Sequence, residues 1–160
     1  MVDLVDLKLE DFQKYTFSGI CCPCRIIDIY DGDTCDIGIK LDNRYIQIRL
    51  RLKDINCAEL KPKHDIRDRD HVIEKAYLAK TKLIEYCTST SIPISPENCK
   101  SRLECHEIME KNRKILYTKL YDFDSFGRVI AELFLDHEYK QSVNQLMIDN
   151  GYAVRYVRSD

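Results

Sequence analysis

The chain has 160 residues, a length that favours a single domain with a sizeable core. Hydrophobic residues make up 44% and charged residues 32%, which is an ordinary globular mixture. The formal net charge of −2 excludes a positive field over the whole molecule, so any nucleic-acid partner must be held by a local basic patch.

Two further features indicate the cellular setting. No apolar run approaches the length of a membrane span, so we expect no membrane partner. The acidic N-terminus, MVDLVDLKLEDF, lacks the basic stretch and apolar run of a secretory signal. We therefore expect a cytoplasmic or otherwise intracellular protein whose eight cysteines are reduced thiols. The mature form of a processed secreted protein is the alternative. We also expect a monomer. A zinc site formed by CCPC (21–24) with Cys99, Cys105 and His106 stays open as an alternative, although its spacing matches no standard finger.

The first third of the chain predicts three consecutive strands. Residues 1–20 have mixed periodicity and are expected to form an N-terminal extension, either a short helix or a docking arm, ahead of a domain spanning 21–160. Strands are predicted at 24–30, 34–41 and 44–52. The third alternates strictly between apolar and polar residues, the pattern of a strand with one buried face.

The middle of the chain predicts a helix and an insertion. A polar loop over 61–70 has no regular pattern. Over 71–87, apolar residues recur at three- and four-residue steps, which predicts a helix with one buried face. Residues 88–112 are expected to be an insertion that two prolines interrupt early and that contains a short helix at 101–111.

The last third predicts two strands and a closing helix. The strands are expected at 114–123 and 128–135, and the helix at 141–151 with Gly151 as its C-terminal cap. The order is therefore three strands, a helix, two strands and a helix. This order predicts an α+β, mainly β domain: a five-stranded Greek-key barrel of the OB type, with a helix between strands three and four and a C-terminal helix.

The run YDGDT (30–34) lies between the first two predicted strands and contains Asp33. By itself it is typical of an ordinary tight turn, because Asp makes local side-chain hydrogen bonds and Gly accepts a positive φ. Whether Asp33 has a functional role depends on which residues lie beside this turn in the folded chain.

The run RLKDINCAE begins at Arg51, on the polar face of the third predicted strand. Asn56 offers a carbonyl oxygen, and Glu59 follows just after the strand. Because strands two and three are neighbours in such a barrel, Asp33 and Asn56 are expected side by side. Two oxygen ligands could then meet around a hard cation such as Ca²⁺. The alternative is a solvated arginine and glutamate at a strand exit.

The run DSFGRV places Arg128 at the start of the fifth predicted strand. Arginine is always charged, and its planar fork suits phosphate oxygens. The alternative is a surface hairpin with an ordinary arginine.

Together these runs resemble the staphylococcal nuclease (thermonuclease) family. Its members commonly carry D-G-D-T, then R-L-x-G-I-D-x-P-E, then Y-G-R, and a terminal helix ending near G-L-A. The matching runs here are DGDT (31–34), RLKDINCAE (51–59), FGR (126–128) and GYA (151–153), and the likeness covers about residues 24–157. The resemblance implies an OB-type barrel and a Ca²⁺-dependent phosphodiesterase acting on DNA and RNA.

The resemblance also implies roles for particular residues. The family's catalytic arginine, glutamate and arginine match Arg51, Glu59 and Arg128. Its metal ligands match Asp33, the position of Asn56, and the backbone carbonyl of Cys57. In this scheme no cysteine needs to act as a nucleophile.

Several positions depart from the family pattern. Asn56 replaces an Asp and so removes one negative charge from the ion's shell, which predicts weak Ca²⁺ binding. Asp54 stands where the family often has Gly, and Ala58 replaces the usual Pro. Phe126 replaces a common Tyr and lacks its hydroxyl.

A shifted register is a further alternative. Arg49 and Asp54 have the same five-residue spacing as Arg51 and Asn56, and would restore the Asp at the metal position. That register places a cysteine where the glutamate belongs. The register of Arg51 is preferred because it keeps Glu59.

Other side chains could contact substrate. Tyr152 and Tyr156 could stack on bases, and their alternative role is packing against the barrel. Lys61 and Lys63 could contact phosphates, but interleaved aspartates also favour a plain solvated loop.

Two functions remain open. The first is an active nuclease, with DNA and/or RNA as its substrate. The second is a catalytically inactive module of the same fold that binds nucleic acid or a protein ligand. Retention of the catalytic set favours the enzyme, and Asn56 favours the inactive module.

Overall fold

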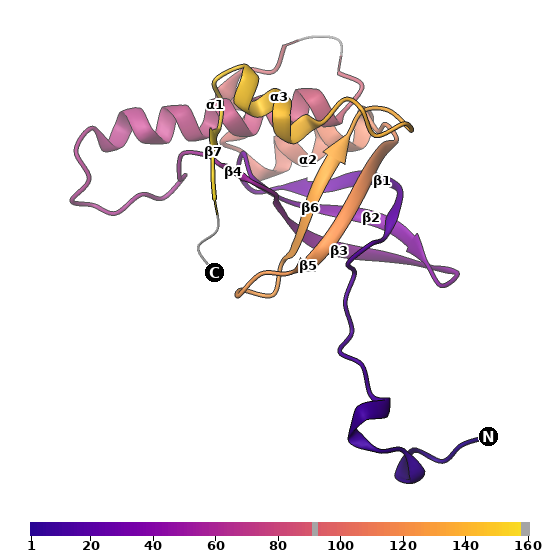
Figure 1. The fold of residues 1–160 in the computed structure, drawn as a ribbon. Helices are drawn as coiled ribbons and strands as arrows, with labels where there is room; N and C mark the ends of the chain where they lie inside the picture. Colours follow the sequence, from indigo (N-terminus) through magenta and orange to yellow (C-terminus); the bar gives the residue numbers. More distant parts are fainter. Residues whose placement is uncertain (91–92, 158–160) are drawn as a thin grey trace.

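The computed structural model describes residues 1–90 and 93–157 (Figure 1). Five strands form a closed barrel with both parallel and antiparallel pairs, and three α-helices accompany it. The architecture is α+β. The helices lie together on one side of the barrel, and the N-terminal segment extends away from the opposite side (Figure 1). In the described ranges, no helix combines the length and the apolar character needed to cross a membrane.

The five strands close the barrel in the order β1-β2-β3-β6-β5, with β5 pairing back to β1. They are β1 (Cys21–Ile29), β2 (Thr34–Leu41), β3 (Arg44–Leu52), β5 (Leu116–Phe123) and β6 (Val129–Phe134). All pairs are antiparallel except β3 with β6, which is parallel. This parallel pair brings the start of β6 beside the end of β3, because Leu50 pairs with Val129 and Arg51 with Ile130.

The strand patterns explain where the core lies. On β3, Leu50 and Leu52 are buried inside the barrel while Arg51 between them points to the other face. The strands β2 and β3 have the predicted bounds. β1 starts at Cys21 instead of the predicted residue 24, because its first four residues pair with β5, a partner distant in sequence.

The long helix α1 (Arg69–Cys87) begins two residues before the prediction. Its predicted apolar stripe packs on the core through Ala79, Leu83 and Cys87, which are buried. The helix α2 (Arg102–Lys111) and the 3₁₀ turn η3 (Pro96–Cys99) lie within the predicted insertion, and α2 packs against η3 and β1.

The closing helix α3 (Val143–Asp149) is shorter than predicted at both ends. The hydroxyl of Ser142 caps its start by accepting a hydrogen bond from the Gln145 amide, and Gly151 follows its end with a φ of +78°. The two-residue strands β4 (Ile55–Asn56) and β7 (Val154–Arg155) then pair. This pairing holds the C-terminal segment beside the loop that follows β3.

The N-terminal segment contains two 3₁₀ turns, η1 (Leu4–Asp6) and η2 (Leu9–Asp11), whose residues are all exposed. Contact with the barrel core begins at Phe17, whose buried ring lies edge-on to Phe123 with centroids 5.6 Å apart. All eight cysteines are free thiols in the structure, and six of them are buried.

Candidate active site

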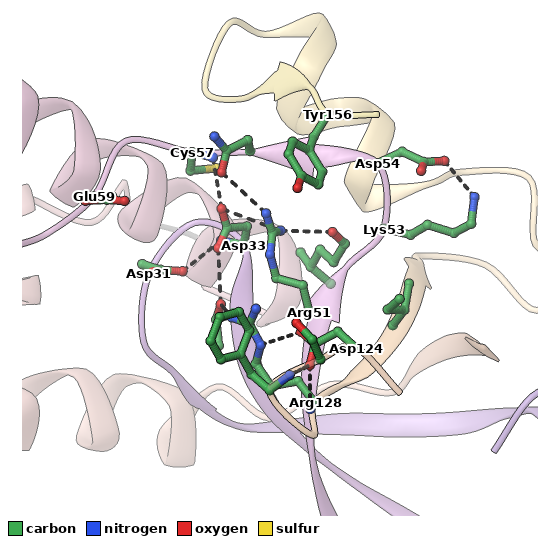
Figure 2. Close-up of a pocket in the computed structure, with 16 residues that line it drawn as sticks. Asp31, Asp33, Arg51, Lys53, Asp54, Cys57, Glu59, Asp124, Arg128 and Tyr156 are labelled. Carbon is green, nitrogen blue, oxygen red and sulfur yellow. Dashed lines mark hydrogen bonds and ion pairs between the residues drawn. The ribbon is translucent and has the colours of Figure 1, made fainter. Parts of the chain in front are cut away.

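A pocket of about 440 Å³ opens at one end of the barrel (Figure 2). It is bounded by the turn before β2, the end of β3, β4, the turn between β5 and β6, and Tyr156 near the C-terminus. The lining includes every candidate catalytic and metal-binding residue of the preferred register: Asp33, Arg51, Asn56, Cys57, Glu59 and Arg128. Arg49, from the alternative register, does not line this pocket.

Strand register explains why residues so distant in sequence meet here. Thr34 at the start of β2 pairs with Arg51 at the end of β3, and the Leu52 amide donates to the Asp33 carbonyl at 2.8 Å. On the other side of β3, the parallel strand β6 begins beside Leu50, so Arg128 directly before β6 reaches the same end of the barrel.

The DGD turn is held tightly against the loop that follows β3. The Asp33 amide donates to Asp31 Oδ1 at 3.1 Å, which closes the turn locally. A side chain at Gly32 would place its Cβ 2.6 Å from Cys57 Sγ, which is too close. The glycine is therefore required by close packing, and the expectation that a positive φ explains it is wrong, because its φ is not in the left-handed region.

The Asp33 carboxylate is nearly buried and accepts hydrogen bonds on both oxygens. Oδ2 accepts from the Cys57 amide at 2.9 Å, and Oδ1 accepts from the Thr34 hydroxyl at 3.1 Å. Arg51 Nη1 lies 3.5 Å from Oδ2, so the carboxylate is also ion-paired. Asp33 is thus fixed by three neighbours, and its orientation is set before any ligand arrives.

Asp31 also lines the pocket, although sequence reasoning did not single it out. Burial, together with the negative charge of Asp33 and a hydrogen bond to it, raises the pKa of Asp31 to about 7. The sequence pattern that could have identified Asp31 is the D-x-D spacing across a tight turn, because this spacing brings two carboxylates together.

Arg51 spans the gap between the two predicted side-chain ligands. Its Nη1 donates to the Leu52 carbonyl at 3.0 Å, and its Nη2 donates to Asn56 Oδ1 at 3.4 Å. The Tyr156 ring lies 5.8 Å from the guanidinium carbon, at cation–π range. The guanidinium therefore neutralises Asp33 and contacts Asn56 at the same time.

Arg128 has a carboxylate partner of its own, Asp124, which sequence reasoning also missed. Arg128 Nε donates to Asp124 Oδ2 at 2.7 Å, while Oδ1 accepts from the amides of Phe126 and Arg128, both at 2.9 Å. Arg128 Nη1 donates to the Thr34 hydroxyl at 3.4 Å. The sequence pattern that could have identified Asp124 is an Asp at the first position of the DSFG turn, four residues before the arginine.

The pKa of Asp124 reflects this environment. Its side chain is 2% exposed, and burial alone would raise its pKa. The hydrogen bonds from the Arg128 backbone and side chain and from the Phe126 backbone outweigh burial, so the pKa of Asp124 lies below its ordinary value. Asp124 is therefore an anion that orients Arg128.

The remaining candidates fall into two groups. Glu59 is exposed at the rim of the pocket and, in Figure 2, lies on the far side of Asp33 from Arg51. Within residues 1–90 and 93–157, its side chain has no hydrogen-bond or ion-pair partner. Lys61, Lys63 and Tyr152 do not line the pocket: the lysines are exposed on the following loop, and Tyr152 is half-buried in a neighbouring cleft.

Asp54 lines the pocket, but its carboxylate pairs with Lys53 at 2.7 Å. Its φ is +62°, which is the left-handed region, and this explains why a glycine suits the position.

The described residues contain no group of three or more His, Cys, Asp or Glu side chains placed to hold a metal ion. The zinc alternative therefore has no support within those ranges. The oxygen donors that line the pocket are of mixed type, because Asn56 offers an amide oxygen beside the carboxylate of Asp33. Cys57 also lines the pocket, and its backbone amide donates to Asp33 Oδ2.

No protein-family model matches the chain, and no curated protein matches it.

Proposed function

We propose that the chain is a nuclease that hydrolyses phosphodiester bonds of DNA and/or RNA with Ca²⁺ as its cofactor. The observation that supports this most is that two guanidinium groups, Arg51 and Arg128, line one pocket with the buried carboxylate of Asp33. The staphylococcal nuclease-like motifs contain these three residues, so the sequence and the geometry support the same proposal.

The strand arrangement supports the finer assignment of the fold as an OB-type Greek-key barrel. The order β1-β2-β3-β6-β5 with a parallel β3–β6 pair is the closure expected of that type. In sequence, α1 lies between the third and fourth barrel strands, and α3 follows the fifth.

The two arginines suit the charge that develops during phosphodiester hydrolysis. Attack by water increases the negative charge on the non-bridging oxygens of the phosphate, and fixed cationic forks stabilise that charge where it forms. Asp124 holds Arg128 through its Nε, while Nη1 contacts the hydroxyl of Thr34, which also lines the pocket. Arg51 comes from the neighbouring strand β3 and lines the same pocket, so the two guanidinium groups could bind one phosphate together.

The donor set fits a hard cation. Asp33, the Asn56 amide oxygen and the Cys57 carbonyl would hold it, and oxygen ligands are those that Ca²⁺ prefers. Bound there, Ca²⁺ would supply Lewis-acid stabilisation of the phosphate. Only one of the three ligands carries a full charge, so weak binding is expected.

Glu59 is the best candidate for a general base. It is exposed and carries no partner among the residues that the structure describes, so its carboxylate is available to accept a proton from water.

A second candidate function is a catalytically inactive module that binds nucleic acid or a protein ligand. One observation favours it: Arg51 contacts both side-chain oxygen donors, Asp33 and Asn56. A guanidinium in that position could replace the cation and bind a phosphate without cleaving it.

A cleavage assay separates the two functions. Purified protein is incubated with single-stranded and duplex DNA and RNA in Ca²⁺, and then in EGTA. The nuclease cleaves in Ca²⁺ and stops in EGTA, and the Arg51→Lys variant does not cleave. Absence of cleavage in both conditions, with binding retained in a gel-shift assay, would support the inactive module instead.

A further inference from the structure

A second groove adjoins the candidate active site on the outer face of the barrel. Its volume is about 740 Å³, and it is lined by Asp36, Gln47, Arg49, Phe126, Gly127 and Arg128. Phe126 and Arg128 also line the first pocket, so the two depressions share one wall. A ligand longer than one nucleotide could pass from the pocket into this groove without leaving the surface.

Arg49 is held in place on the floor of this groove. Its Nε donates to Asp36 Oδ1 at 3.0 Å, and its guanidinium lies 4.2 Å above the centre of the Tyr30 ring and bonds the Tyr30 hydroxyl. Gln47 donates to the other Asp36 oxygen at 3.0 Å, which fixes that carboxylate. The Arg49 side chain is still 50% exposed, so an oriented cation faces solvent.

The position of Arg49 relative to the active site follows from the strand. Arg49 and Arg51 lie two residues apart on the same face of β3, which separates them by about 6.6 Å along the strand. Successive phosphates of an extended nucleic-acid strand are separated by a comparable distance. A strand whose scissile phosphate lies at Arg51 could therefore place the neighbouring phosphate at Arg49.

Phe126 supplies a surface for a base at the boundary of the two depressions. Its side chain is 84% exposed, which is unusual for a large aromatic residue. The turn that carries it is rigid, because the buried Asp124 carboxylate accepts the amides of Phe126 and Arg128. Base stacking on an exposed ring is tolerant of sequence and contributes strongly to single-strand binding.

We propose that this groove is a second nucleotide subsite, specific for single strands, in which Arg49 binds the phosphate next to the scissile one and Phe126 stacks on an unpaired base. The proposal deepens the nuclease function and rests on it for the position of the scissile phosphate. A duplex fits poorly, because its bases are already stacked on one another and do not offer a free face to Phe126.

Binding measurements in EGTA test the proposal without cleavage. The affinity of a labelled 12-nucleotide single strand is measured by fluorescence anisotropy at several salt concentrations. Arg49→Gln should weaken binding about tenfold and lower the salt slope by about 0.7, the value for one lost phosphate contact on a single strand. Arg44→Gln, at an exposed arginine at the start of β3 outside both depressions, is the matched control and should change affinity far less.

Phe126→Ala provides an independent variant, because an exposed ring is not needed for folding. It should weaken single-strand binding about fivefold or more and leave the salt slope unchanged. Equal losses in Arg49→Gln and Arg44→Gln, or a duplex of the same length that binds the wild type as tightly as the single strand, would overturn the proposal. If binding depends on Arg49 and Phe126 in a protein that never cleaves, the subsite stands and the nuclease function fails. If the protein cleaves and Arg49→Gln binds normally, only the subsite fails.

Discussion

The two arginines of the candidate active site face one pocket, but the protein holds them in different ways. Arg128 has its own buried carboxylate, Asp124, at 2.7 Å. Arg51 lies 3.5 Å from Asp33, a carboxylate that also accepts two other hydrogen bonds and is a proposed metal ligand. Arg128 therefore has a partner outside the proposed metal site, whereas the partner of Arg51 is itself a proposed metal ligand. If the pocket binds a phosphate and a cation as proposed, Arg128 would be a fixed phosphate-binding group and Arg51 would compete with the cation for the Asp33 oxygens.

Replacing either arginine should have the largest effect on activity. Arg51→Gln and Arg128→Gln should each lower kcat/KM at least about 100-fold, because each removes a cation that stabilises the developing charge. Steady-state cleavage of a single-stranded oligonucleotide measures this loss.

Calcium affinity should distinguish the same two variants. Arg51→Gln should tighten Ca²⁺ binding several-fold, since it removes a competing cation from Asp33, while Arg128→Gln should leave it unchanged. Isothermal titration calorimetry measures both. Equal effects of the two substitutions on Ca²⁺ affinity would remove the distinction between the arginines.

Asn56→Asp tests whether this end of the pocket, where Arg51 contacts Asn56, binds a cation. The added charge should tighten Ca²⁺ binding about tenfold, because the affinity of an oxygen site rises with ligand charge. The matched control is Asn98→Asp, which makes the same charge change at an exposed position far along the chain. No gain in the Asn56 variant, or an equal gain in both, would argue against a cation at this pocket.

Asp124→Asn should remove the ion pair that orients Arg128. An amide in place of the carboxylate presents an N–H to Arg128 Nε, so unfolding free energy at pH 7 should fall by about 1 kcal/mol. The folded-state pKa of Asp124 is depressed, so its stabilisation is present above the unfolded value of 3.8 and is lost as pH falls through the lower folded value. Urea unfolding should show the gap between wild type and variant at pH 7 closing below pH 4. A gap that stays constant over this pH range would contradict the assignment.

Asp54→Gly should have the smallest effect. The substitution relieves a left-handed φ of +62°, and the greater freedom of glycine in the unfolded chain offsets part of the gain. The expected net stabilisation is about 0.5 kcal/mol, because the exposed ion pair with Lys53 that is lost contributes little. Asp54→Ala is the control and should be less stable than the glycine variant, since alanine keeps the strain. Urea unfolding that ranks the two variants in reverse would refute the account of this turn.

Local sequence patterns predicted the elements whose pairing is local. The bounds of β2 and β3 agree with the prediction because alternation and a short turn define this hairpin within one stretch of chain. The start of β1 could not be predicted, because Cys21 to Cys24 are extended through pairing with β5, about 95 residues later in the chain.

The candidate site shows the same limit. The meeting of Asp33 with Arg51 could be predicted, because Asp33 directly precedes β2 and Arg51 lies near the end of the neighbouring strand β3. The role of Asp124 could not, because an Asp in a turn has the same pattern whether it faces solvent or a guanidinium. The positive charge of Lys61 and Lys63 favours a phosphate contact, but charge does not fix the direction in which a loop points, and both side chains lie outside the pocket.

The central claim is that Ca²⁺ and two guanidinium groups act on one phosphate in this pocket. Its most direct test is the rate of oligonucleotide cleavage as a function of free Ca²⁺, for the wild type and for Asn56→Asp. We expect cleavage that EGTA abolishes, with the midpoint of the Asn56→Asp curve at about tenfold lower Ca²⁺. Cleavage that persists in EGTA, or no cleavage by either protein at any Ca²⁺ concentration, would contradict the account.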